Sequence, residues 1–311
     1  MSPRILLLLA FLAALPVAAQ EQQFADLGTC DLENGEELRD CRVGFRTLGT
    51  LNVDRDKAIL IPSWYGGNTV VWVYLHADLL GQDHGYFVIL VDALANGVSV
   101  SPSNSEAQPG DAFPEITTRD MVRSQYRLVT EVLELDGLVA VMGVSMGGMQ
   151  TFEWGVLYPD FMRKLIPIAG SPKLAGHDVA LWEAYKRLFQ WSVDCQCDEA
   201  AEALTAVRTL DAGTATNLIR QADAMMATDV TRSFGDDWAE AARAVRAEML
   251  VIVAASDPVV TPSPAVDFAG LLGDRATLIV METDCGHGIP ECEMFRSRSL
   301  IREFLRSRGE G

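Results

Sequence analysis

The sequence predicts an α/β fold built on a mostly parallel sheet. Short apolar runs of strand length, such as Lys57 to Pro62 and Tyr86 to Asp92, alternate with stretches that have helical spacing. Continuous apolar runs are typical of strands buried on both faces, and their alternation with helices predicts parallel strands joined by right-handed crossovers. A third observation is the stretch Val139 to Gln150, which we interpret as a strand, a sharp turn and a helix.

The first nineteen residues have the three parts of a secretory signal. Arg4 supplies the basic start, Ile5 to Leu15 is an apolar run, and Val17 and Ala19 are the small residues before a cleavage site. We expect cleavage after Ala19 and export to the periplasm or the extracellular space; an uncleaved membrane anchor is the competing interpretation. No later stretch is apolar enough for a transmembrane helix, so we expect no membrane span after the signal is removed.

The length of the chain indicates its domain organisation, and its net charge limits the kinds of partner it can bind. From the length of 311 residues and the order of its segments, we predict a signal peptide (residues 1–19), a single core (residues 20–170 and 249–311) and an insertion (residues 171–248). The formal net charge of −18 argues against nucleic acid and anionic membranes as partners, because both repel an acidic surface.

The even number of cysteines predicts disulfides in an exported chain. The six are Cys30, Cys41, Cys195, Cys197, Cys285 and Cys292. The first two flank the turn signal Asn34-Gly35 and so can face each other across paired strands. The last two lie on either side of His287, close enough in sequence for a disulfide between them to restrain its loop. For the middle two, a tight local disulfide, bonds to other partners and a metal pair stay open, with the metal least favoured.

The first half of the core is predicted to contain a hairpin, two helices and a long loop. Thr29 to Leu51 has the alternation of a β-hairpin, and Thr69 to Leu79 can form a helix. The loop from Ala95 to Pro114 is rich in turn residues, and loops of this length are commonly functional. Thr117 with Asp120 can cap a helix that runs to about Leu135.

The second half adds three strands and a terminal helix. We expect strands over Lys164 to Ala169, Met249 to Ala255 and Ala276 to Met281, and a helix over Glu291 to Arg306. The insertion has helical spacing and no convincing strand, so we expect a helical lid over the active site. Most of its aromatic residues and methionines are expected to form the insertion's own core. The expected helices are Val179 to Trp191, Glu199 to Leu210, Thr216 to Ala227 and Asp236 to Ala247.

Ser145 is the candidate nucleophile. It lies in Gly143-Val144-Ser145-Met146-Gly147, at the turn between a predicted strand and a predicted helix. A serine on such a turn has a strained backbone, and glycine at the flanking positions lets strand and helix approach closely enough to expose the hydroxyl. The alternative is a glycine-rich turn with an inert serine.

A serine nucleophile needs a base, and the base needs an orienting acid. Of the four histidines, only His287 follows the last predicted strand, in a loop flanked by glycines. Asp257 comes directly after the apolar run that starts at Val251, where open α/β sheets keep their catalytic groups. We therefore predict His287 as base and Asp257 as acid, with Asp284 as the alternative acid.

The tetrahedral intermediate of acyl transfer needs fixed hydrogen-bond donors for its oxyanion. The backbone N–H of Met146, at the start of the nucleophile helix, is the first candidate. The second is expected from the loop after Pro62, from either Trp64 or Tyr65. We expect no cofactor and no metal for this chemistry.

Four segments of the predicted core carry a family resemblance: Gly143 to Gln150, Glu153-Trp154, Tyr158 to Asp160 and Thr47 to Asn52. They resemble the homoserine O-acetyltransferase family of the α/β-hydrolase superfamily. The resemblance also covers Asn96 to Ser103 and the helix start Arg119 to Val122. It implies an α/β-hydrolase fold with flanking helices, and a catalytic triad at Ser145, Asp257 and His287.

The departures from this family bear on the reaction. The family's enzymes acylate homoserine from acyl-CoA in the cytoplasm, whereas this chain is predicted to be exported. The family usually has an aspartate where Gly288 follows the histidine here, and Lys186 and Arg187 lie near where it places a substrate-binding arginine. We predict hydrolysis of a small or medium ester through an acyl-serine. The alternatives are acyl transfer to an alcohol and a catalytically silent binding module.

Overall fold

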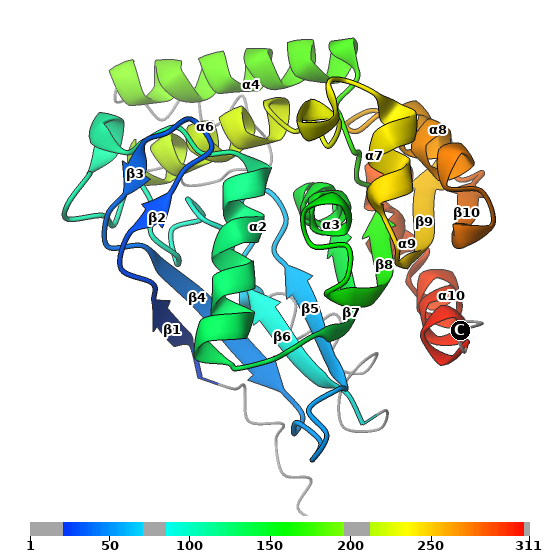
Figure 1. The fold of residues 1–311 in the computed structure, drawn as a ribbon. Coiled ribbons are helices and arrows are strands. Elements are labelled where there is room, and N and C mark those ends of the chain that lie inside the picture. The colour runs from blue at the N-terminus through cyan, green and yellow to red at the C-terminus, as the bar shows by residue number, and fades with distance from the viewer. Residues whose placement is uncertain (1–20, 71–84, 196–211, 308–311) are drawn as a thin grey trace, which may run out of the picture.

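The core of the protein is an eight-stranded sheet (Figure 1). The computed structural model describes residues 21–70, 85–195 and 212–307, so the predicted signal peptide lies outside the described residues. The strand order is β1-β4-β6-β5-β7-β8-β9-β10. The six strands from β6 to β10 in that order pair in parallel, and β4 pairs antiparallel with both β6 and β1. The predicted α/β class with a mostly parallel sheet is therefore confirmed.

The central strands β5 and β7 are short apolar runs, and every residue of both is buried. Strands covered by helices on both faces require this composition. The bounds are β1 (Gln23–Asp26), β4 (Arg42–Leu48), β5 (Ala58–Pro62), β6 (Phe87–Val91), β7 (Leu138–Val144), β8 (Met162–Ile168), β9 (Glu248–Ala254) and β10 (Ala276–Met281).

Two hydrophobic clusters occupy the two faces of the sheet. Side chains alternate along each strand, so Leu60 belongs to one cluster while Ile59 and Ile61 belong to the other. The first cluster joins the sheet to helices α2, α3 and α8, and the second joins it to α10. The bounds are α2 (Thr118–Arg127), α3 (Met146–Leu157), α8 (Ser263–Leu272), α9 (Ile289–Cys292) and α10 (Met294–Arg306).

The helix predicted after Thr117 begins as expected. Thr117 accepts a hydrogen bond from the backbone N–H of Asp120, whose carboxylate accepts one from the N–H of Thr117, so the capping box is complete. The helix α2 then passes into a π-helical turn from Leu128 to Val132. Of the helix predicted over Thr69 to Leu79, the first two residues are helical and the rest lies outside the described residues.

The hairpin predicted over Thr29 to Leu51 is shorter than expected. Its strands are β2 (Cys30–Asp31) and β3 (Glu37–Leu38), which pair across the Asn34-Gly35 turn. A disulfide between Cys30 and Cys41 closes the base of this hairpin. The alternating segment that follows is β4, and it pairs with β1 and β6 of the main sheet because its buried side chains, such as Phe45, belong to the main core.

Helices occupy the chain between β8 and β9. They are α4 (Gly176–Cys195), α6 (Ala212–Met226) and α7 (Trp238–Ala244), and the helix predicted over Glu199 to Leu210 lies outside the described residues. Figure 1 shows α4 and α6 lying across the end of the sheet toward which β5 and β8 point. In the described ranges, no helix is long and apolar enough to cross a membrane.

Candidate active site

Ser145 lies at the turn between β7 and α3. Its backbone has φ 55° and ψ −122°, a region that non-glycine residues adopt rarely and with strain. A Cβ atom on Gly143 would overlap the carbonyl group of Gly147, and one on Gly147 would lie 2.7 Å from the carbonyl oxygen of Pro62. Glycine at these two positions therefore allows the close crossing that presents the serine hydroxyl.

The structure brings Ser145, His287 and Asp257 together from three different loops. The distance from His287 Nε2 to Ser145 Oγ is 2.9 Å, and the distance from His287 Nδ1 to Asp257 Oδ2 is 2.7 Å. Asp257 follows β9, and His287 follows β10 in the short 3-10 helix Gly286–Gly288. The alternative acid, Asp284, is exposed to solvent.

The carboxylate of Asp257 is held in place from its other side. Its Oδ1 accepts hydrogen bonds from the backbone N–H groups of Val259 at 2.8 Å and Val260 at 3.0 Å. The side chain is almost completely buried. Since a carboxylate can only accept here, the Nδ1 of His287 carries the proton and its Nε2 is left to accept from the Ser145 hydroxyl.

The loop of His287 is restrained by a disulfide and a glycine. Cys285 and Cys292 are bonded to each other on either side of the histidine. Gly286 has φ 52°, a conformation that favours glycine, and a Cβ atom there would lie 3.1 Å from Pro258 Cδ, next to the acid. Of the two remaining cysteines, Cys197 lies outside the described residues.

The residues predicted to supply the oxyanion donors lie next to Ser145 or line its cavity. Met146 is buried and begins α3, and Trp64 and Tyr65 line the same cavity as Ser145. The carbonyl of Ser63 accepts a hydrogen bond from Gln150 Nε2 at 3.2 Å. Because a trans peptide is planar, the N–H of Trp64 points to the opposite side from that carbonyl.

Gln150 is itself fixed by a buried chain of hydrogen bonds. Its Oε1 accepts from Gln125 Nε2 at 2.6 Å, and Gln125 Oε1 accepts from the Trp154 indole at 2.9 Å. All three side chains are almost fully buried, so each depends on the others for its hydrogen bonds. Sequence reasoning missed this network; its only local signal was the position of Gln150 one turn after Met146.

The helix α6 binds the loop that contains Trp64 and Tyr65. The Tyr65 hydroxyl donates to the carbonyl of Leu218 at 3.1 Å, and the Gly66 N–H donates to Gln221 Oε1 at 2.8 Å. Burial, and then the negative charge of Asp223, raise the pKa of Tyr65, so its hydroxyl stays protonated and donates. No sequence signal indicated Gln221.

The cavity at Ser145 has a volume of about 320 Å³ and mainly apolar walls. Its lining residues are Trp64, Tyr65, Val144, Ser145, Trp182, Val259, His287, Gly288, Pro290 and Glu291. Trp182 comes from α4 and contributes a third aromatic side chain. Within the described ranges, this lining contains no lysine or arginine. Lys186 instead pairs with Asp223, and Arg187 is exposed to solvent.

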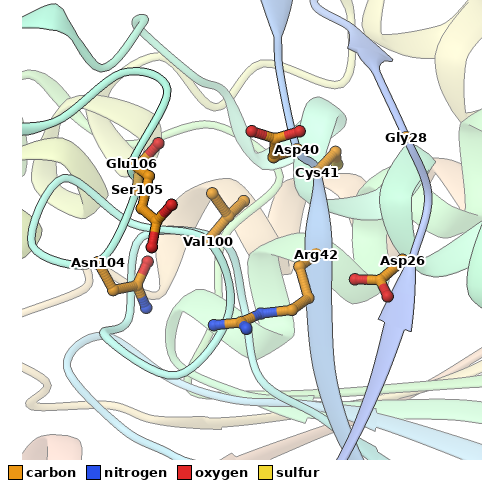
Figure 2. Close-up of a pocket in the computed structure, with 9 residues that line it drawn as sticks. All are labelled: Asp26, Gly28, Asp40, Cys41, Arg42, Val100, Asn104, Ser105 and Glu106. Atoms are coloured by element: carbon orange, nitrogen blue, oxygen red, sulfur yellow. The ribbon is translucent and has the colours of Figure 1, made fainter.

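A second cavity, also of about 320 Å³, lies among β1, β4 and the loop that follows β6. Figure 2 shows the carboxylates of Asp26, Asp40 and Glu106 around it, with the guanidinium group of Arg42 at one side. Its lining contains none of the residues predicted for catalysis. This second cavity is therefore separate from the one at Ser145.

A model of the alpha/beta hydrolase fold family matches residues 57–291. The chain belongs to this family. The match starts at the strand before the Trp64 loop and includes Ser145, His287 and Asp257, which are joined in series by hydrogen bonds.

Individual relatives are esterases and acyltransferases. A probable esterase from Corynebacterium glutamicum is 39% identical over 161 residues, which are 50% of this chain and 45% of the relative. An ethyl acetate hydrolase from Pseudomonas veronii is 34% identical over 164 residues, 52% of this chain and 47% of the relative. Homoserine O-acetyltransferases are also among the relatives, which confirms the resemblance drawn from the sequence. The chain thus spans just under half of the length of the two esterases.

A solved structure extends the similarity over the whole fold. The acetylester hydrolase from Corynebacterium glutamicum matches with a TM-score of 0.82 at 25% sequence identity, covering 92% of this chain and 96% of that chain. Membership of this family, together with these relatives, therefore supports the interpretation of this protein as a hydrolase or an acyltransferase.

Proposed function

We propose that this protein is a serine esterase that hydrolyses small carboxylic esters through an acyl-Ser145 intermediate. The observation that carries the proposal is the continuous hydrogen-bonded series from Ser145 Oγ through His287 to Asp257. It joins a nucleophile and a base that line a cavity to an orienting acid, which is the arrangement that acyl transfer through serine requires.

In the proposed first step, Ser145 Oγ attacks the ester carbonyl while His287 Nε2 takes its proton. Asp257 stabilises the resulting imidazolium, which then donates the proton to the leaving alcohol. In the second step a water molecule attacks the acyl-serine, and His287 again takes and returns the proton. Before each proton transfer, the Asp257 side chain keeps the neutral imidazole in the required tautomer.

We assign the oxyanion donors to the backbone N–H groups of Met146 and Trp64. Met146 lies at the N-terminus of α3, where the helix dipole favours negative charge. The hydrogen bond from Gln150 to the Ser63 carbonyl supports Trp64 over Tyr65, because it sets the plane of the peptide that contains the Trp64 N–H. Donors fixed before the reaction stabilise the oxyanion without reorganisation.

Water is the proposed acyl acceptor. Among the described lining residues there is no cation to bind the phosphates of CoA or the carboxylate of homoserine. The esterases among the relatives support the same choice. A volume of about 320 Å³ lies at the small end of ligand cavities, about 300–1,000 Å³, which supports a small ester.

We further propose export after removal of residues 1–19, and a lid function for residues 171–248. Two disulfides in the described residues support an oxidising compartment. The lid is supported by Trp182 of α4, which lines the cavity, and by the hydrogen bonds from the Trp64 loop to α6.

Turnover of p-nitrophenyl esters tests the proposed reaction. Ser145→Ala is expected to lower kcat by at least about 10³-fold, since the nucleophile is lost while the oxyanion donors remain. The acetate ester is expected to be cleaved with a higher kcat/KM than the octanoate ester because the cavity is small. Unchanged turnover in the variant would contradict the proposal. Homoserine-dependent release of CoA from acetyl-CoA would instead identify the protein as an acyltransferase.

A further inference from the structure

Three large aromatic side chains form part of the lining of the cavity at Ser145. Trp64 and Tyr65 come from the loop after β5, and Trp182 comes from α4. The rings of Tyr65 and Trp182 meet edge to face, with centroids 4.7 Å apart and planes inclined by 65°. Aromatic faces carry negative electrostatic potential, so walls of this kind attract cations as well as apolar groups.

Glu291 also lines this cavity, and it is exposed to solvent. It belongs to α9, directly before Cys292, whose disulfide to Cys285 ties this helix to the loop of His287. The other described lining residues include no aspartate, lysine or arginine. The cavity therefore combines aromatic walls with one negative charge and no lysine or arginine among the described lining residues.

The negative charge of Glu291 favours a cationic ligand in the cavity over a neutral or an anionic one. A neutral or anionic group that covers a carboxylate removes water from it without replacing the lost hydration, which is unfavourable. A cationic group replaces that hydration and also gains from the aromatic faces. The net charge of the chain, −18, adds a long-range field that concentrates cations near the surface.

We infer that this cavity recognises a cationic group, a quaternary ammonium or a protonated amine, on the ester substrate. The group lies between the aromatic side chains and the Glu291 carboxylate while the ester carbonyl lies at Ser145. Esters that carry a carboxylate in the same place are rejected. The inference rests on the proposed ester hydrolysis and narrows it to a substrate class.

Binding of choline and of its uncharged isostere 3,3-dimethyl-1-butanol tests the recognition without turnover. Calorimetry on the full chain is expected to give a Kd for choline about tenfold lower than for the alcohol. Glu291→Gln is expected to reduce this ratio about threefold. The matched control is Glu282→Gln, because Glu282 is also exposed but lies outside the cavity lining; this variant leaves the ratio unchanged.

Turnover of acetylcholine, 3,3-dimethylbutyl acetate and 4-acetoxybutanoate separates this inference from the proposed function. The expected order of kcat/KM is cationic, then neutral, then anionic ester. Hydrolysis of the neutral ester, together with no preference for choline in binding or for acetylcholine in turnover, overturns the inference alone. An equal loss of preference in the Glu291 and Glu282 variants also overturns it. Selective binding of choline with no hydrolysis of any ester overturns the proposed function alone.

Discussion

Glu153 on α3 is a buried carboxyl whose pKa differs strongly from that of an exposed one. It is 2% exposed and accepts a hydrogen bond from Arg119 Nε at 3.2 Å. Burial raises its pKa from 4.5 to about 7, although the Arg119 guanidinium opposes this shift; the Glu33 charge also raises the pKa and Arg232 lowers it. In the folded state Glu153 therefore binds its proton at a pH at which the unfolded chain has released it.

The raised pKa of Glu153 predicts that stability falls as pH rises. Between about pH 4.5 and 7 the folded state binds more protons than the unfolded state, so the contribution of Glu153 to the free energy of unfolding decreases across this window, by about 3 kcal/mol in total. Urea unfolding at pH 5 and pH 8 measures it. Glu153→Gln should lose this part of the pH dependence.

The control for Glu153 is Glu131→Gln. Glu131 is half exposed and pairs with Arg127 on the surface, where an ion pair contributes little. This variant should keep the pH dependence of the wild type. The same slope in the Glu153 variant and the wild type would contradict the assignment.

At the scale of elements, α6 holds the loop that supplies the proposed oxyanion donor. Gln221 is fully buried and bridges two backbone segments, since it accepts from the Gly66 N–H and donates to the Leu94 carbonyl at 3.1 Å. Its amide thus connects an insertion helix to the ends of two sheet strands. We interpret Gln221 as a positioning residue that acts through the Trp64 loop.

We expect replacement of Gln221 to lower kcat with little change in KM. Gln221→Ala frees the Gly66 N–H and lets the Trp64 donor move, which weakens binding of the oxyanion in the transition state; we expect about a tenfold lower kcat for p-nitrophenyl acetate. Asn217→Ala is the matched control because Asn217 lies on the same helix and its amide binds Ser103 instead. Equal effects of the two variants on kcat would show that helix stability alone is responsible.

At the scale of the whole molecule, stability depends on a large two-sided core and on covalent closure of the N-terminal hairpin. The disulfide between Cys30 and Cys41 spans 11 residues. A loop of this length restricts the unfolded chain, so replacement of both cysteines by serine is expected to lower the free energy of unfolding by about 3 kcal/mol. Urea unfolding of this double variant beside the wild type measures the effect. An unchanged unfolding midpoint would indicate that the hairpin contributes nothing to the cooperative unit.

Much of the fold was predictable because the signals for it are local. Five- to seven-residue apolar runs indicated the parallel strands, and Thr117 with Asp120 indicated the start of α2. The segment that became β4 was wrongly joined to a hairpin, since its alternation is equally compatible with either partner. Pairing with β6 is decided by the main core, into which Phe45 packs.

By itself, the sequence determined the elbow around Ser145 and the order in which Asp257 and His287 follow it. These depend on backbone requirements within a few residues, above all glycine where Cβ atoms would overlap. The tertiary structure alone decided how Gln150 and Gln221 hold the loop of Trp64 and which side chains surround the cavity. Gln221 and Gly66 are 155 residues apart, and no sequence spacing records such a contact because packing of the whole chain creates it.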